Sequence, residues 1–335
     1  MAPGERHRTQ ESDHFMEGIT IGVFGTDQQV KSTFEGSVAK KSEAEGITVY
    51  TRVEGGRRYS FLDTADYPER IQGYSRVASL VDHALYFFPS SGRLAAPDGE
   101  LAVLLGAFGL PGKMELADGA ATPEAARSAL RGTAVAGFTS EERQSRSSTI
   151  DLSHITPRTD FPRDRTLIYV DRVFTVKGVG TVALGFVLSG SVSIHDQLRL
   201  IPGPSDLRAD IKGIQVSDVD IESAGRGIRV GLSLRGVDPK DLERSHWMDD
   251  GSCQLSDAPT FEVAMSPFYR QDIESRDLHI QLPGEMVPAK IVGAGPGRVT
   301  AKLPSQVPVW DGMRGAVVDL NGGSLRVAAG ATCKF

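Results

Sequence analysis

Cysteine is scarce in this sequence, and so are long apolar runs. The two cysteines, Cys253 and Cys333, lie far apart without CxxC spacing, which excludes a disulfide framework and a cysteine-based metal site. No segment approaches the ~20 apolar residues of a membrane span. The first residues, MAPGERHRTQESDHF, lack the apolar core of a signal peptide. We therefore expect a cytoplasmic protein with no membrane partner and a disordered tail over residues 1–17.

The chain also lacks an excess of positive charge. Its 37 Lys and Arg residues are outnumbered by 43 Asp and Glu residues, which gives a formal charge of -6 at pH 7. This balance argues against a DNA-binding protein with a strongly basic surface, although it is compatible with a local basic face. Length and glycine are abundant instead. A chain of 335 residues predicts two or three domains of roughly 100 to 150 residues each, and 37 glycines favour turn-rich β structure.

Residues 18–150 alternate between strand and helix patterns, which predicts a doubly wound α/β domain with a mostly parallel sheet. The expected strands cover residues 19–24, 47–53, 58–65, 83–89 and 133–138, and the expected helices cover residues 68–81, 100–108 and 122–132. The pair Gly55-Gly56 predicts a tight hairpin turn because glycine readily adopts positive φ angles. Thr122 is expected to cap its helix. Pro111 is expected to interrupt a strand at the residues that follow it.

The second half of the chain is predicted to be all β. Residues 139–150 read as a last surface helix or loop, and residues 151–165 form a linker rich in Ser, Thr, Pro and charge. Short strands separated by Gly, Pro and Asp turns then predict one β-barrel over residues 166–250 and a second over residues 255–335. A short helix is expected over residues 239–248.

One stretch of the first domain carries a motif with a known chemistry. GTDQQVKS, residues 25–32, follows the first apolar strand and matches the phosphate-binding loop Gly-x4-Gly-Lys-Ser/Thr except at its second glycine. Gly25, Lys31 and Ser32 fit the pattern, whereas Val30 occupies the glycine position. A β-branched residue there crowds a phosphate, and positive φ would add at least ~1 to 2 kcal/mol of strain.

The order of one such domain and two barrels resembles the translational GTPases of the elongation factor Tu class. Within that class the resemblance is to the selenocysteine-specific elongation factor and SelB-like proteins. It covers residues 18–335 and is strongest in the second domain. The matching stretches are VDRVFTVKGVGTVALGFVLSGSVSIHDQLRLIP (170–202), IKGIQV (211–216) and AGRGIRVGLSLRGVD (224–238).

The resemblance implies a nucleotide site in the first domain. Lys31 and Ser32 would contact the phosphates and Mg²⁺, Thr48 would be the switch-one threonine, and Asp63 would begin the switch-two motif. The best match to the guanine-binding motif is residues 112–115, where the lysine is kept and a glutamate replaces the aspartate. The vestigial nucleotide-binding set is Gly25, Lys31, Ser32, Thr48, Asp63, Lys113 and Glu115.

The switch-two motif departs from the family pattern at two functional positions. Asp66 replaces the glycine whose amide would meet the γ-phosphate, and Tyr67 replaces the histidine that would orient water. A carboxylate at about 4 Å from a phosphate charge costs on the order of 4 kcal/mol at an effective dielectric constant near 20. Together with Val30, these changes predict weak or absent GTP binding. We therefore expect no cofactor, no resident metal and no catalytic residue.

The resemblance also implies that the second domain holds the aminoacyl end of a tRNA. Possible RNA-binding residues in the matching region are Arg172, Lys177, Arg226, Arg229 and Arg235. Nearby acidic residues weaken the positive electrostatic potential of these side chains. An equally good interpretation is therefore that they are solvent-exposed charges on the barrel surface with no RNA partner.

We expect an elongation factor-like protein with a degenerate GTPase domain, which binds tRNA, the ribosome or a protein partner without GTP cycling. Two alternatives stay open. The first is a working GTP hydrolase that uses Lys31, Ser32, Thr48 and Asp63 with GTP and Mg²⁺. The second is a protein-binding scaffold outside translation.

Overall fold

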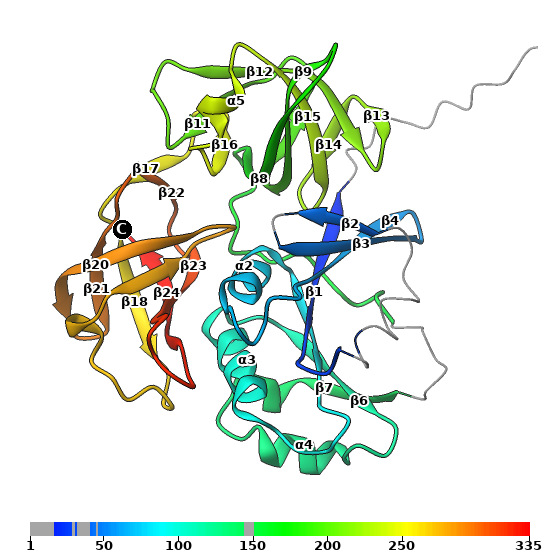
Figure 1. Ribbon diagram of the computed structural model, residues 1–335, viewed down its shortest axis with the longest axis vertical. Helices are drawn as coiled ribbons and strands as arrows, with labels where there is room; N and C mark the ends of the chain where they lie inside the picture. Colours follow the sequence, from blue (N-terminus) through cyan, green and yellow to red (C-terminus); the bar gives the residue numbers. More distant parts are fainter. Residues whose placement is uncertain (1–16, 29–30, 32–40, 45, 144–150) are drawn as a thin grey trace, which may run out of the picture.

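The computed structural model describes residues 17–28, 31, 41–44, 46–143 and 151–335. The expected tail therefore lies almost wholly outside the described residues, as do Val30 and Ser32. Three units are arranged around a common junction (Figure 1): an α/β unit, a β unit that starts at β8, and a closed barrel at the C-terminal end. Within the described residues, no helix is both long and apolar enough to cross a membrane.

The first unit is built on one seven-stranded sheet with the order β2-β3-β4-β1-β5-β6-β7. Its strands are β1 (Gly18–Phe24), β2 (Lys41–Ala44), β3 (Ile47–Glu54), β4 (Arg57–Asp63), β5 (His83–Phe87), β6 (Gly112–Ala117) and β7 (Thr139–Arg143). Strands β4, β1, β5, β6 and β7 pair in parallel, whereas β2 and β3 add an antiparallel hairpin edge. The α/β prediction is confirmed, including the Gly55-Gly56 turn, where both φ angles are positive.

The helices of the first unit are α2 (Gln72–Leu80), α3 (Ala96–Ala107) and α4 (Pro123–Ala129). Helices α2 and α3 lie between the sheet and the third unit (Figure 1), and both contact strands of the C-terminal barrel. Thr122 caps α4 as predicted, because its hydroxyl accepts a hydrogen bond from the amide of Ala125.

Three predictions for the first unit were wrong. Residues 134–137 form a 3-10 helix, Ala134–Gly137, and not a strand. The apolar residues of that stretch pack as a turn, with Val135 in the core, rather than pairing with a neighbouring strand. The last strand, Thr139–Arg143, occupies the start of the stretch that was expected to be a surface helix or loop, because it pairs in parallel with β6. Pro111 does not interrupt β6, because it precedes the strand and uses its carbonyl, which accepts from the amide of Ala84 at 2.9 Å.

The second unit is a barrel made from one seven-stranded sheet, β11-β16-β8-β9-β15-β12-β13. Strand β11 also pairs with β12, which closes the six strands from β11 to β12 into a barrel and leaves β13 outside it. The strands are β8 (Leu167–Val176), β9 (Gly180–Ser189), β10 (Ser191–Ser193), β11 (Gln197–Ile201), β12 (Arg208–Val216), β13 (Val219–Ile221), β14 (Ser223–Gly225), β15 (Arg229–Arg235) and β16 (Trp247–Asp249). The expected helix over residues 239–248 is only the short α5 (Pro239–Leu242), because Trp247 already belongs to β16.

The third unit is a closed six-stranded barrel in the order β18-β21-β20-β19-β23-β24. Its elements are β17 (Gln254–Ser256), β18 (Thr260–Met265), β19 (Leu278–Gln281), β20 (Met286–Gly295), β21 (Arg298–Lys302), β22 (Val307–Val309), β23 (Arg314–Val318) and β24 (Val327–Lys334), with a 3-10 turn at Ile273–Ser275. Strands β17 and β22 form a separate pair. The fold class predicted from sequence, an α/β domain followed by two barrels, is confirmed.

The predicted linker is tied to all three units, and its contact with the second is a hydrogen bond that the hydroxyl of Ser189 donates to the carbonyl oxygen of Pro162 at 2.7 Å. Leu152 and Ile155 are buried against the sheet face that carries Ile21. The amide of Arg158 donates to Asp82 at the end of α2 at 2.8 Å. Farther along, the carbonyl of Asp160 accepts from the indole N–H of Trp310 in the third unit at 2.6 Å. The segment therefore fixes the units rather than separating them.

The first strand also touches the second unit directly. The amide of Gly18 donates to the carbonyl of Arg226 at 2.9 Å. A Cβ atom added to Gly18 would lie 2.8 Å from the carbonyl oxygen of Gly227, and one added to Gly227 would lie 2.2 Å from the carbonyl oxygen of Gly18. Only glycine permits this approach from either side.

Candidate functional site

The lysine of the phosphate-loop motif is buried and fully engaged. Lys31 is 0% exposed. Its Nζ atom lies 2.8 and 3.0 Å from the two carboxylate oxygens of Asp63 and 2.7 Å from the hydroxyl of Tyr74. An ammonium group has three donors, and three acceptors surround this one. Lys31 therefore neutralises a carboxylate inside the protein.

Tyr74, on α2, joins the parts of this cluster. Its hydroxyl lies 2.9 Å from Oδ1 of Asp63 and 3.1 Å from the carbonyl oxygen of Gly25. Its ring is fully buried, packs on Phe24 with the centroids 5.1 Å apart, and lies 5.3 Å from Nζ of Lys31. Tyr74 lies within the helix predicted over residues 68–81, but the sequence analysis gave it no polar role. A tyrosine on a buried helix face was the one available signal, because a buried hydroxyl needs a partner.

Carboxylates hold the start of the loop. The hydroxyl of Thr26 donates to Asp98, a residue that is 2% exposed. Asp27 accepts from the amide of Ser90 at 3.3 Å and from its hydroxyl. Thr26 is thus bound to an acidic side chain, and the loop itself contributes the carboxylate of Asp27, which is bound to Ser90.

The switch-two positions are divided between solvent and core. Asp66 is exposed, whereas Tyr67 is 5% exposed and directs its hydroxyl to α3. The hydroxyl lies 2.6 Å from the carbonyl oxygen of Pro97 and 3.0 Å from Glu100. Burial, reinforced by the charge of Glu100, raises the pKa of Tyr67, so its proton is firmly held. The side chain at the histidine position is committed to packing against α3.

The other predicted nucleotide-binding residues occupy strands. Thr48 lies in β3, directly opposite Asp63 in the antiparallel ladder. Lys113 and Glu115 lie within β6, where Lys113 pairs with Glu141 and stands 3.9 Å from Glu115. Ligands of open α/β sheets bind beyond the carboxyl ends of the strands. In the strand register, Lys113 of β6 pairs with Leu85 of β5, which pairs with Val23 of β1. Lys113 therefore lies inside the sheet, before the carboxyl ends of these strands. The structure thus brings Gly25, Lys31 and Asp63 together, with Thr48 on the adjacent strand. Lys113 lies in the body of the sheet, whereas Glu115 is level with Phe87, the last residue of β5.

Near Lys113, the buried His83 at the start of β5 gives the first unit a pH dependence. Burial, with smaller effects from His154 and Lys113 and an opposing one from Asp82, lowers the pKa of His83 to about 4 from 6.5. Its Nε2 atom has no hydrogen-bond partner among the described residues. Because the folded pKa is the lower one, the unfolded chain takes up this proton first as the pH falls.

We expect the stability provided by neutral His83 to be complete above pH 6.5 and to disappear as the pH falls to 4. The loss should be about 2 to 3 kcal/mol, measured by urea unfolding across this range. His83→Gln, which cannot titrate, should show a shallower decline. Parallel profiles for the two proteins would contradict the assignment.

Two of the five predicted RNA-binding residues are engaged inside the protein. Arg226 pairs with the buried Asp82, and its guanidinium lies 5.2 Å from the ring of Phe161. Arg229 forms a two-pronged pair with Asp171 at 2.7 and 2.8 Å. Both side chains are therefore structural in this arrangement.

The other three predicted residues are exposed on one side of the second barrel. Arg172 lies opposite Leu184 in the β8–β9 ladder, Lys177 occupies the turn between those strands, and Arg235 ends β15. Directly opposed residues of an antiparallel pair share a face. Phe174, 37% exposed, shares the Arg172 face because it lies two residues farther along β8. We call Arg172, Phe174, Lys177 and Arg235 the barrel face.

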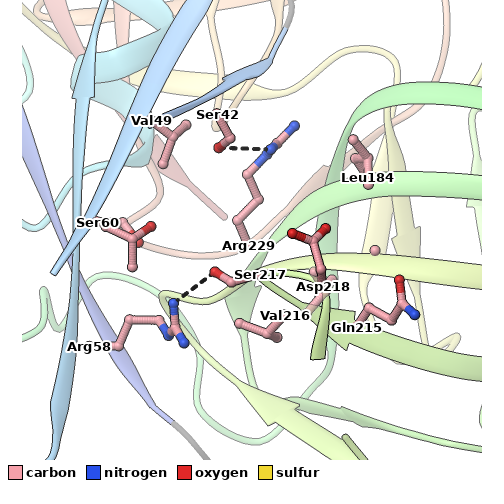
Figure 2. Close-up of a pocket in the computed structure, with 13 residues that line it drawn as sticks. Ser42, Val49, Arg58, Ser60, Leu184, Gln215, Val216, Ser217, Asp218 and Arg229 are labelled. Carbon is pink, nitrogen blue, oxygen red and sulfur yellow. Dashed lines mark hydrogen bonds between the residues drawn. The ribbon is translucent and has the colours of Figure 1, made fainter. Parts of the chain in front are cut away.

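The barrel face continues into a cavity of about 340 Å³ between the first and second units (Figure 2). Leu184 and its neighbours across β15 and β12, Gly231 and Gln215, line the cavity on the barrel side. Arg58 and Ser60 of β4 line it on the sheet side. The remaining lining residues are Ser42, Val49, Thr51, Val216, Ser217, Asp218, Arg229 and Val230.

Two arginines reach into this cavity from opposite units. Nη1 of Arg58 donates to the hydroxyl of Ser217 at 3.1 Å, and Nη1 of Arg229 donates to the hydroxyl of Ser42 at 3.4 Å (Figure 2). Burial lowers the pKa of Arg58, and its Nε atom has no hydrogen-bond partner among the described residues. Ser217 and Asp218 both have positive φ angles, 52° and 66°, in the turn from β12 to β13. That two-residue turn aims Ser217 at Arg58.

Comparison with known proteins places these features in context. No protein-family model matches the chain. An uncharacterized protein of Methanocaldococcus jannaschii is 28% identical over 77% of this chain and 81% of its own length. The selenocysteine-specific elongation factor of the same organism is 23% identical over 83% of this chain and 66% of its own length. The mouse selenocysteine-specific elongation factor is 32% identical, over 44% of this chain and 25% of its own length.

Solved structures agree with these relatives on the fold. The translation elongation factor SelB of Methanococcus maripaludis in complex with a GTP analogue superposes with a TM-score of 0.79 at 18% identity. The match covers 96% of this chain and 80% of that one. A bacterial selenocysteine-specific elongation factor gives a TM-score of 0.78 at 17% identity, over 95% of this chain and 58% of that one.

Proposed function

We propose that this chain is a SelB-like factor that binds RNA without GTP cycling, because its relatives include selenocysteine-specific elongation factors and its fold matches that of SelB structures. The absence of GTP cycling rests on one observation: Lys31 forms a buried ion pair with Asp63 and also donates a hydrogen bond to the hydroxyl of Tyr74.

Among the described residues of the loop and its surroundings, those around Lys31 do not fit a bound Mg²⁺ and nucleoside triphosphate. To meet a phosphate, Lys31 would have to leave Asp63, which is 6% exposed, and strand its carboxylate. Breaking a buried ion pair in this way costs about 3 to 5 kcal/mol, which corresponds to a loss of two to four powers of ten in affinity. The carboxylates of Asp27, within the loop, and of Asp98, which accepts from Thr26 of the loop, add repulsion toward a phosphate. No step of a GTPase reaction is therefore assigned to these side chains.

The barrel face and the cavity beside it support the proposal that the protein binds RNA. An exposed aromatic ring between cationic side chains is the pattern that binds a single-stranded end, because bases stack on the ring while the cations meet phosphates. The cavity of about 340 Å³ is large enough for a terminal group, and the guanidinium of Arg58 places a positive charge in its lining. We assign the single-stranded acceptor end of a tRNA to this surface.

The test is tRNA binding measured with GTP, with GDP and with neither, at about 50 mM salt, where phosphate contacts are strong. We expect equal affinity in the three conditions, and calorimetry with Mg²⁺ and GTP should show no binding in the micromolar range. A tenfold dependence of RNA affinity on GTP would overturn the proposal in favour of a working GTPase. Absence of tRNA binding, together with a co-purified protein partner, would favour a scaffold.

A further inference from the structure

Arg326, at the entry to β24 in the third unit, binds the first unit through both its backbone and its side chain. Its amide donates to Oε1 of Glu100 at 2.6 Å, and its guanidinium forms a two-pronged pair with the same carboxylate. The guanidinium also donates to the carbonyl oxygens of Pro68 at 3.0 Å and Glu69 at 3.3 Å. It lies 5.7 Å from the ring centre of Tyr67.

Glu100, on α3, is the other half of this contact. It is 2% exposed and accepts hydrogen bonds from both Arg326 and the hydroxyl of Tyr67. Hydrogen bonding to Glu100 raises the pKa of Arg326, so the pair stays charged. One carboxylate thus holds the third unit and the segment of residues 67–69 at the same time.

That segment is the part of the first unit that follows Asp63, where the family resemblance places switch two. In a switching protein it must be free to change conformation when the bound nucleotide changes. Here its tyrosine is buried against α3, two of its carbonyls are bonded to the third unit, and an arginine fork lies over its ring. Moving it would break each of these contacts together.

A second contact fixes the same pair of units nearby. The hydroxyl of Ser79, on α2, accepts from the amide of Gly284 at 2.9 Å. Gly284 has a φ of 89°, and a Cβ atom there would lie 2.2 Å from the ring of Tyr169 in the second unit. All three units meet at this glycine, so a shift of the third unit would also disturb the second.

We propose that Arg326 locks the segment of residues 67–69 to the third unit, so that the first and third units keep one arrangement whatever nucleotide is present. This inference does not depend on the absence of GTP binding. A nucleotide that did enter would meet a first unit already fastened through Glu100.

Fluorescence energy transfer between the two units tests the lock. Burial raises the pKa of Cys253 to about 12 and that of Cys333 to about 11, so both thiols resist labelling at neutral pH. Cysteines introduced at the exposed positions Arg131 and Val292 would carry the dyes. We expect the same transfer efficiency with GTP, GDP and neither. A nucleotide-dependent change in the wild-type protein would overturn the proposal.

Hydrogen exchange of residues 64–71 measures the contribution of Arg326 directly. Arg326→Ala should speed exchange there on the order of tenfold or more, because charge-assisted hydrogen bonds are lost. Arg326→Lys should lose most of the protection as well, because a point charge cannot reproduce the fork. Arg314→Ala is the matched control. It removes a third-unit guanidinium that bonds the carbonyls of Phe108 and Gly109 at 3.1 and 3.2 Å, away from this segment.

Each outcome decides the matter. Fast exchange confined to residues 64–71 in the two Arg326 variants, and absent from Arg314→Ala, would support the lock. Unchanged protection in Arg326→Lys or Arg326→Ala would overturn it. If Arg326→Ala does not fold, the lysine variant carries the measurement. Calorimetric titration of GTP in the same samples separates failure of the lock from failure of the proposed function.

Discussion

Lys31→Ala is expected to lower the free energy of unfolding by about 3 to 5 kcal/mol and to leave nucleotide binding undetected, as in the wild type. The substitution strands the buried carboxylate of Asp63 and removes a partner of the Tyr74 hydroxyl. In a working phosphate loop, the lysine faces its ligand, and the same change removes nucleotide binding while sparing the fold. Urea unfolding and calorimetry of one protein preparation give both quantities.

Two comparisons isolate the ion pair. Lys177→Ala removes an exposed lysine and should change stability by no more than about 0.5 kcal/mol. The double variant Lys31→Met/Asp63→Leu should lose less stability than Lys31→Ala, since it leaves no unpaired charge. A stable Lys31→Ala protein that has lost GTP turnover would show instead that the lysine serves a nucleotide.

Charge reversal on the barrel face is expected to weaken tRNA binding on the order of a hundredfold or more. The triple variant Arg172→Glu/Lys177→Glu/Arg235→Glu removes three cations and places three anions along the assigned path of the RNA. The affinity should also become less sensitive to salt. The slope of log affinity against log salt concentration should become shallower by roughly 0.7 for each single-strand phosphate that is no longer neutralised. Filter binding or anisotropy at several salt concentrations provides both numbers.

The barrel of the third unit offers a control with the same change in net charge. Lys290, Arg298 and Lys302 are exposed on β20 and β21, so Lys290→Glu/Arg298→Glu/Lys302→Glu shifts the charge equally at another surface. We expect this variant to retain affinity within a few-fold of the wild type. Equal losses in the two triple variants would mean that the protein responds to overall charge and that the barrel face has no special role.

Sequence patterns predicted the main strands and helices of this protein well, because buried strands and amphipathic helices produce a hydrophobic periodicity within short stretches of sequence. The apolar run of β1 and the double-glycine turn between β3 and β4 are local features, and both are as predicted. Short strands such as β17 and β22, of three residues each, were missed because their pairing partners lie far away in the chain.

The candidate site was only partly predictable for the same reason. The motif departures at Asp66 and Tyr67 can be read from the sequence alone. The hydrogen bond between Lys31 and Tyr74 cannot be predicted from the sequence, because it depends on which turn of α2 faces the loop. Likewise, nothing local distinguishes the engaged Arg229 from the exposed Arg235 in β15, since the difference lies in Asp171 on another strand. Tertiary partners decide whether a charged residue is structural or available.

The contact between Gly18 and the turn at Gly227 sets an order of events during synthesis. About 200 residues separate the two glycines, so at 5 to 20 residues per second the first strand waits roughly 10 to 40 s for its partner to be made. Until then the amide of Gly18 lacks the carbonyl of Arg226. Completion of the first strand's N-terminal contact is therefore a late step, which joins the beginning of the chain to a barrel that emerges long after it.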